Sequence, residues 1–173
     1  MSLIIVNIKN KNIKDFLGKP LPYYTLSAID LYLKRNDNIE YDIVVNSDSK
    51  ELLDMLKNSG IRNVDVIERI SELGGDTVGK IDVIRNCLQI MKKEKKYEYD
   101  IVVDLDITSP LRRVEDIENI INKQIAANAD VTTSVVAARR NPYFNQLKKR
   151  KKDIRKSVIQ DLLHDSRHRK YMI

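Results

Sequence analysis

Short apolar runs alternate with longer amphipathic stretches, and this alternation restricts the possible fold more than any other feature of the chain. The runs SLIIVNI, YDIVVNS and YDIVVDL are largely apolar, which is typical of strands covered on both faces of a sheet. Between such runs, apolar residues recur every three or four positions, which predicts helices with one buried face. We therefore expect an α/β fold with a doubly wound, mostly parallel sheet.

The pattern predicts five strands and four helices. The predicted strands cover residues 2–8, 41–47, 63–69, 99–105 and 130–138. The predicted helices cover residues 21–35, a short segment that Asp48 caps and that stops near Gly60, residues 78–93, and a segment that Ser109 and Pro110 open. The apolar side of that last helix is expected to comprise Leu111, Val114, Ile117, Ile120 and Ile121.

Composition points to one globular domain in the cytoplasm. The chain has 173 residues, of which 42% are hydrophobic and 32% charged. No apolar run approaches the roughly 20 residues that span a bilayer, and no signal peptide is evident, so no membrane partner is expected. Cys87 is the single cysteine, which excludes an internal disulfide, and we expect it to be an inert core thiol.

Positive charge is concentrated at the C-terminal end. Residues 139–173 hold 12 Lys+Arg against 3 Asp+Glu, whereas residues 1–138 are slightly acidic. We therefore divide the chain into an α/β domain (1–138), in which a ligand site is expected, and a basic arm (139–173). The arm has few aromatic residues and no recognisable RNA or DNA motif, which argues against a nucleic-acid-binding module.

The segment DLDITSPLRR, which begins at Asp104, carries more polar groups than a turn and a helix cap require. Asp104 and Asp106 alternate with Leu105 and should point to the same side, where a carboxylate pair beside phosphates can hold Mg²⁺. The alternative is a hydrogen-bonded loop in which one aspartate caps the next helix. Ligands of open α/β sheets bind at the carboxyl ends of the strands, which is where this segment should lie.

The residues that follow the aspartates favour an anionic ligand. Thr108 and Ser109 offer hydroxyl and backbone N–H groups at an expected helix N-terminus, although Ser109 can equally be a simple cap. Arg112 would lie in the first helical turn, where a cation opposes the macrodipole, so it should have a carboxylate or phosphate partner. Arg113 is expected to be a solvated surface charge. His164 and His168 are four residues apart, but the basic residues around them argue against a metal site.

Five blocks resemble, in order and at about the same spacing, the acylneuraminate cytidylyltransferases, which are the CMP-sialic acid synthetases and their relatives. The blocks are NIKDFLGKPLPYYTLSAI, IVVNSDSKELLD, ERISELGGDT, YDIVVDLDITSPLRRVEDI and VTTSVVAARRNPYF. The resemblance implies a Rossmann-like nucleotidyltransferase that activates an acidic nine-carbon sugar with CTP and Mg²⁺, releasing pyrophosphate. It also implies that the segment after NPYF is an arm that joins two subunits, so a homodimer is expected.

The resemblance also implies roles for particular residues. The residues matched to the nucleotide are Lys11, Asn12, Arg69, Asp76, Thr77, Thr108 and Ser109. The chemistry of the residues themselves makes Asp106 and Arg112 the candidate catalytic residues, and Asp104 and Asp106 the candidate metal ligands. By the residues alone, Lys11 is read as part of a solvated lysine-rich loop and Asp76–Thr77 as a helix cap.

The chain departs from the family pattern at several points. Asp106 stands where many members have Gln, and Ile107 where many have Pro, which leaves the acceptor sugar open. A glycine-rich phosphate loop before Lys11 and an acidic C-terminal segment are missing from the sequence, and we expect both to exist in the full-length protein. The alternatives are a nucleotidyltransferase with another sugar or nucleotide, and a non-catalytic nucleotide-binding relative.

Overall fold

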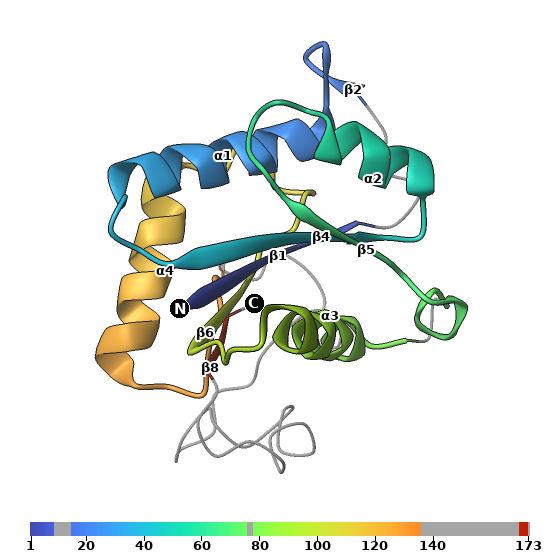
Figure 1. Ribbon diagram of the computed structural model, residues 1–173. Helices are drawn as coiled ribbons and strands as arrows, with labels where there is room; N and C mark the ends of the chain where they lie inside the picture. The colour runs from blue at the N-terminus through green and yellow to red at the C-terminus, as the bar shows by residue number, and fades with distance from the viewer. Residues whose placement is uncertain (9–14, 76–77, 136–169, 173) are drawn as a thin grey trace, which may run out of the picture.

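The computed structural model describes residues 1–8, 15–75, 78–135 and 170–172 (Figure 1). Its centre is a six-stranded sheet in the order β5-β4-β1-β6-β8-β7, in which every pairing is parallel. The strands are β1 (Ser2–Ile8), β4 (Tyr41–Ser47), β5 (Asp65–Glu68), β6 (Ile101–Asp104), β7 (Val131–Thr132) and β8 (Lys170–Met172). The predicted α/β fold with a mostly parallel sheet is confirmed.

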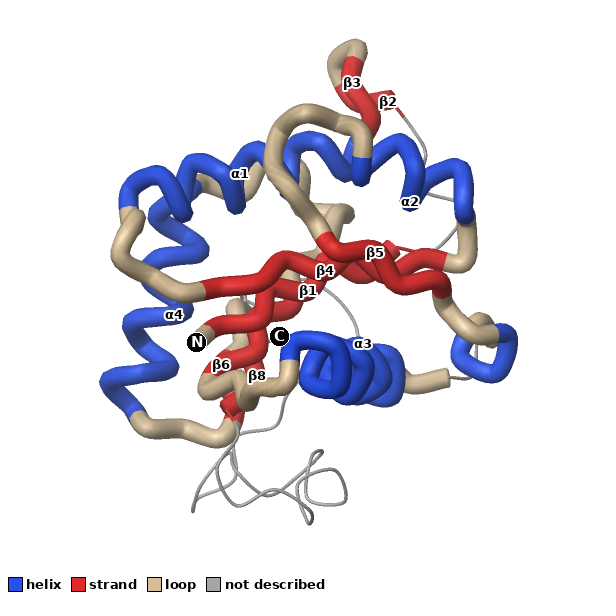
Figure 2. Tube along the Cα trace, viewed as in Figure 1, coloured by secondary structure: helices blue, strands red, loops and turns tan. Residues whose placement is uncertain are grey.

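Helices cover both faces of this sheet, as Figure 2 shows. One face packs against α1 (Leu21–Arg35), α2 (Lys50–Lys57) and α4 (Val114–Ala127), and the other against α3 (Lys80–Lys95). Alternate residues of β1 divide between the two cores: Ile4 and Val6 face the first, and Leu3 and Ile5 face the second. All four side chains are at most 1% exposed, which explains why the strand sequence is continuously apolar rather than alternating.

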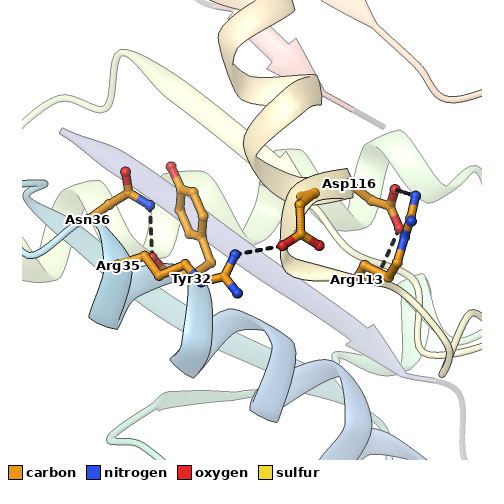
Figure 3. A network of polar contacts seen from close by, with 6 residues as sticks. Tyr32, Arg35, Asn36, Arg113 and Asp116 are labelled. Carbon is orange, nitrogen blue, oxygen red and sulfur yellow. Dashed lines mark hydrogen bonds and ion pairs between the residues drawn. The ribbon is translucent and has the colours of Figure 1, made fainter.

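The N-terminus of α4 differs from the prediction. The helix begins at Val114, whereas Ser109–Pro110 lies in a turn that precedes it. Arg113 is the N-cap, and its backbone N–H donates to the Asp116 carboxylate at 2.9 Å (Figure 3). The prediction that Leu111 is buried is therefore wrong, because its side chain is 76% exposed. Val114, Ile117 and Ile121 are buried, as expected.

Helices α1 and α4 are also joined by an ion pair on the same face of the sheet. Arg35, in the last turn of α1, donates to the Glu115 carboxylate of α4 at 2.7 Å (Figure 3). In the same turn of α1, the Asn36 side chain donates to the Tyr32 carbonyl at 2.9 Å. Both side chains of the ion pair are more than half exposed, so its contribution to stability is small.

Other boundaries differ by a few residues from those predicted. Helix α2 is capped by Ser49, whose hydroxyl accepts from the Leu52 backbone N–H at 3.3 Å, and not by Asp48. The predicted strand 130–138 is reduced to β7 within the described residues. The sequence did not predict β8, nor the hairpin of β2 (Asp15–Phe16) and β3 (Lys19–Pro20), which stands beyond α1 in Figure 1.

Among the described residues, no helix is long and apolar enough to cross a membrane.

Candidate functional site

The carboxyl ends of four parallel strands lie side by side at the topological switch point. From β1 the chain runs to β4 and β5 on one side, and after α3 it crosses to β6 on the other side. Backbone hydrogen bonds continue just past the strand ends, from Arg69 N–H to the Ser47 carbonyl (2.8 Å) and from Leu105 N–H to the Ile5 carbonyl (3.0 Å). These bonds fix the segments that follow β5 and β6, so the polar residues after them are held against the sheet at the position where such folds bind ligands.

Lys80 joins Asp104, the last residue of β6, to Asp106, which lies two residues further along the chain. Its Nζ atom lies 2.5 Å from Asp104 Oδ2 and 3.6 Å from Asp106 Oδ2. The Asp104 side chain is 1% exposed, the Asp106 side chain 49%. The predicted convergence of the two carboxylates is confirmed, because both approach the same ammonium group.

The Asp104 carboxylate is poorly satisfied. Apart from the ion pair with Lys80, neither of its oxygens meets a hydrogen-bond partner in the described part of the chain. Burial raises the pKa of Asp104, although Lys80 acts in the opposite direction. A buried carboxylate in this condition is costly to maintain, which is more typical of a functional group than of a structural one.

Asp106 is held in a defined position by its own loop. Its Oδ1 accepts from the Thr108 backbone N–H at 3.0 Å, and its carbonyl accepts from Arg112 Nη2 at 2.9 Å. Although partial burial alone would raise it, the pKa of Asp106 is lowered overall by the Thr108 N–H and by Lys80. Asp106 is therefore a carboxylate at neutral pH with a free face toward solvent.

Arg112 reaches back over the same loop. It does not lie in the first turn of α4, as predicted, but in the preceding turn, where its backbone N–H donates to the Ser109 carbonyl at 3.3 Å. Its Nη1 atom is buried and has no partner among the described residues, and burial lowers the pKa of the guanidinium. A cation with an unused buried donor beside two carboxylates fits the prediction that Arg112 contacts an anionic ligand.

Arg69 connects the ends of three strands instead of lying open in a pocket. It is 5% exposed, and its Nε atom donates to Asn46 Oδ1 at 2.9 Å. Its Nη2 atom donates to the Ile8 carbonyl at 3.1 Å and also to the Asn7 side chain. Asn46 in turn donates to the Ile67 carbonyl at 3.1 Å. This network fixes the relative positions of β1, β4 and β5 at the site.

The remaining predicted residues are placed as follows. Thr108 and Ser109 are exposed in the turn beside Asp106, so they are close to the cluster and accessible. Four predicted nucleotide contacts lie outside the described residues: Lys11, Asn12, Asp76 and Thr77. Most of the basic arm, residues 139–169, also lies outside them. Contact of any of these residues with a nucleotide stays a prediction.

Sequence reasoning missed Lys80, Asn7 and Asn46. Lys80 carried a usable signal, because it occupies the first residue of α3, where a cation opposes the helix dipole. Asn7 and Asn46 each lie near the end of an apolar strand. A polar residue there indicates a hydrogen-bond partner, but the neighbouring sequence does not identify which residue that partner is.

Cys87 is a core residue, as expected. It is fully buried in α3, and burial raises the pKa of its thiol to about 12. A thiol in this environment carries almost no thiolate at neutral pH, which excludes it as a nucleophile.

A second group of charged residues lies at the opposite end of the sheet, where β4 and β5 begin. An open groove there is lined by three acidic and three basic residues. These charges are paired with one another: Asp30 contacts both Arg62 (2.8 Å) and Lys34 (2.8 Å), and Lys95 contacts Asp65 (2.9 Å). The groove is thus internally neutralised and does not resemble a site for a charged ligand.

The described residues contain no group of three or more His, Cys, Asp and Glu side chains that could hold a metal ion. The Asp104–Asp106 pair supplies two carboxylates, which suits Mg²⁺ only when phosphates and water complete its coordination. Oδ1 of Asp104, which has no hydrogen-bond partner in the part of the chain that the structure describes, and the exposed side of Asp106 fit that incomplete donor set.

A parallel sheet that has helices on both faces and changes strand order between β1 and β6 defines an open, doubly wound α/β protein. Residues 7–170 match the family model described as cytidylyltransferase, and the chain belongs to that family. This result confirms the resemblance drawn from the sequence blocks.

Curated relatives are similar over much of the chain. The chain is 30% identical over 138 residues to post-translational flagellin modification protein B of Campylobacter coli, covering 80% of this chain and 56% of the relative. It is 27% identical over 138 residues to CMP-N,N'-diacetyllegionaminic acid synthase of Campylobacter jejuni, which again covers 80% of this chain and 56% of the relative. It is 30% identical over 118 residues to pseudaminic acid cytidylyltransferase of C. jejuni, covering 68% of this chain and 47% of the relative. The chain thus spans about half the length of these relatives.

Proposed function

We propose that this chain is the nucleotide-binding part of an enzyme that transfers CMP from CTP to an acidic nine-carbon sugar. The observation that carries the proposal is the Lys80, Asp104, Asp106 and Arg112 cluster at the switch point of a cytidylyltransferase-family fold. One relative is named CMP-N,N'-diacetyllegionaminic acid synthase and another pseudaminic acid cytidylyltransferase, which supports an acceptor of the nonulosonic acid class.

In the proposed reaction, a sugar hydroxyl oxygen attacks the α-phosphorus of CTP. The bond from that phosphorus to its bridging oxygen breaks, pyrophosphate leaves, and the hydroxyl gives up its proton. Catalysis of this kind consists mainly of positioning and of stabilising negative charge. Arg112 is suited to contact a phosphate, because its Nη1 has no hydrogen-bond partner among the residues that the structure describes. The exposed residues Thr108 and Ser109 lie in the same loop.

Mg²⁺ is proposed as the cofactor, held by Asp104 and Asp106 together with phosphate oxygens. When bound, it would neutralise negative charge on the phosphates. The support is the buried Oδ1 of Asp104, which lacks a hydrogen-bond partner within the described ranges, and the lowered pKa of Asp106, which keeps it ionised. We also propose that the enzyme acts in the cytoplasm, where CTP is available.

A second candidate function is a nucleotidyltransferase with a different sugar or nucleotide. The acidic side chain of Asp106 favours this alternative, because it places negative charge where many family members have the neutral Gln. A carboxylate there would repel an acidic sugar unless Lys80 or a metal ion neutralised it. The identity of the substrate is thus tied to the charge of this cluster.

The test is pyrophosphate release by the full-length protein with Mg²⁺, each nucleoside triphosphate and a panel of acidic nine-carbon sugars. Release that requires CTP and one of these sugars supports the proposal. Release with a different nucleotide supports the second candidate. No release, together with no CTP-dependent shift in melting temperature, would reject both.

Variants locate the reaction at this site. Arg112→Ala and Asp106→Ala should each lower kcat/KM by about 100-fold or more without unfolding the protein, since one charge-stabilising contact is typically worth that factor. Arg113→Ala is the matched control, because this neighbouring arginine is 74% exposed and its ion pair is with Asp116 of its own helix. Equal activity of the Arg112 and Arg113 variants would place the site elsewhere.

A further inference from the structure

Lys80 occupies an unfavourable position that the helix itself does not explain. It is the first residue of α3, where the partial positive charge of the helix N-terminus disfavours a cation. Its N-cap, Gly79, offers no side chain to satisfy the first turn. The attraction that keeps the ammonium there comes from Asp104, at 2.5 Å, and from Asp106, at 3.6 Å.

The exposures of the three side chains show how the contact is arranged. Asp104 is 1% exposed, Lys80 37% and Asp106 49%. The lysine thus contacts the buried carboxylate while part of its own side chain remains open to solvent. With Arg112, which is paired through the Asp106 carbonyl, the cluster holds two positive and two negative side chains and is formally neutral.

We propose that Lys80 is a positioning residue that occupies the carboxylates of Asp104 and Asp106 until a divalent cation displaces it. This inference rests on the metal role that the proposed function gives to the two aspartates. An ammonium 2.5 Å from Asp104 Oδ2 and a divalent cation on the same carboxylate repel each other, so each weakens the binding of the other. Lys80 therefore lowers the affinity for metal alone and keeps the two carboxylates in place.

The charge balance makes metal binding depend on nucleotide. A divalent cation that entered beside Lys80 and Arg112 would leave the cluster with an excess of two positive charges. A triphosphate supplies the missing negative charge, and the flexible lysine stem lets the displaced ammonium turn toward those phosphates. The intact protein should therefore bind a divalent cation weakly alone and more tightly with CTP.

The experiment measures Mn²⁺ binding to the full-length protein by electron paramagnetic resonance, without nucleotide. Lys80→Met and Lys80→Gln should bind Mn²⁺ about tenfold more tightly than the intact protein, because no ammonium competes for the buried carboxylate. Lys80→Arg, which keeps the charge, should bind as weakly as the intact protein. The double variant K80M/D104N should lose the gain.

Urea unfolding gives a second measurement that does not depend on activity. Lys80→Met leaves Asp104 buried without its counter-ion, so the variant should be less stable without metal and should recover stability as Mn²⁺ is added. In K80M/D104N the added Mn²⁺ should have no such effect. Lys80→Gln retains a hydrogen-bond donor and serves if Lys80→Met does not fold.

Two results would overturn the inference: Mn²⁺ affinity unchanged in both neutral variants, or a gain that persists when Asp104 is also replaced. Pyrophosphate release is measured in a separate assay, so that failure of the proposed function can be distinguished from failure of this inference. Absence of CTP turnover with the expected Mn²⁺ pattern would reject the proposed function and leave the competition intact, whereas normal turnover without that pattern would reject the competition alone.

Discussion

At the scale of single residues, the polar groups at the strand ends divide into two kinds. Arg69 donates hydrogen bonds to Asn7, Asn46 and the Ile8 carbonyl. In contrast, Asp104 and Arg112 each have a buried polar atom without a hydrogen-bond partner among the described residues. Satisfied buried groups stabilise the fold, and unsatisfied ones lower stability and are retained for another reason. The structure thus gives Arg69 a structural role in addition to the nucleotide contact implied by resemblance.

This structural role can be tested by stability. Arg69→Met should lower the free energy of unfolding by on the order of 3 kcal/mol, because it leaves several buried acceptors without a donor. Urea unfolding followed by circular dichroism measures the change. Lys50→Met is the control: its ion pair with Glu68, next to Arg69, spans 3.6 Å between exposed side chains, so its loss should cost less than about 1 kcal/mol. Similar losses in both variants would mean that Arg69 contributes little.

At the scale of elements, sequence predicted the strongly periodic segments and failed where capping signals competed. The bounds predicted for α1 agree with the structure, because its apolar periodicity is clear and basic residues occupy its last turn. The start of α4 was placed too early, since Ser109–Pro110 has the composition of a helix start. Instead, the Asp106 side chain and the Arg112 guanidinium bind backbone groups of this loop and hold it in turns until the Arg113–Asp116 cap.

The start of α2 gives a direct test of such competition. Sequence favours Asp48 as the cap, whereas the structure assigns that role to the Ser49 hydroxyl. Ser49→Ala should therefore reduce the free energy of unfolding by about 1 kcal/mol. Asp48→Ala, at an exposed neighbouring position, should change it by less than about 0.5 kcal/mol. Thermal or urea unfolding of the two variants decides the matter, and the reverse order of effects would restore the sequence-based assignment.

At the scale of the whole molecule, the chain beyond position 138 returns to the main sheet. Strand β8 lies between β6 and β7, so residues far apart in sequence become neighbours in the order of strands. Sequence could not predict this strand, because three residues carry no periodicity and its pairing depends on partners that lie far away in the chain. The convergence of the first four predicted strands on one site was predictable, because parallel strands joined by helices place their carboxyl ends at one edge.

The basic segment between β7 and β8 leads to the last prediction, which concerns assembly. Resemblance implies that this segment, which lies outside the described residues, joins two subunits. Sedimentation equilibrium of the full-length protein at micromolar concentration should therefore give the mass of a dimer. Replacing residues 145–160 with a glycine–serine linker of equal length keeps β8 and should give a monomer with a similar melting temperature. A monomer in the intact protein, or a dimer that survives the replacement, would show that the basic segment does not form the interface.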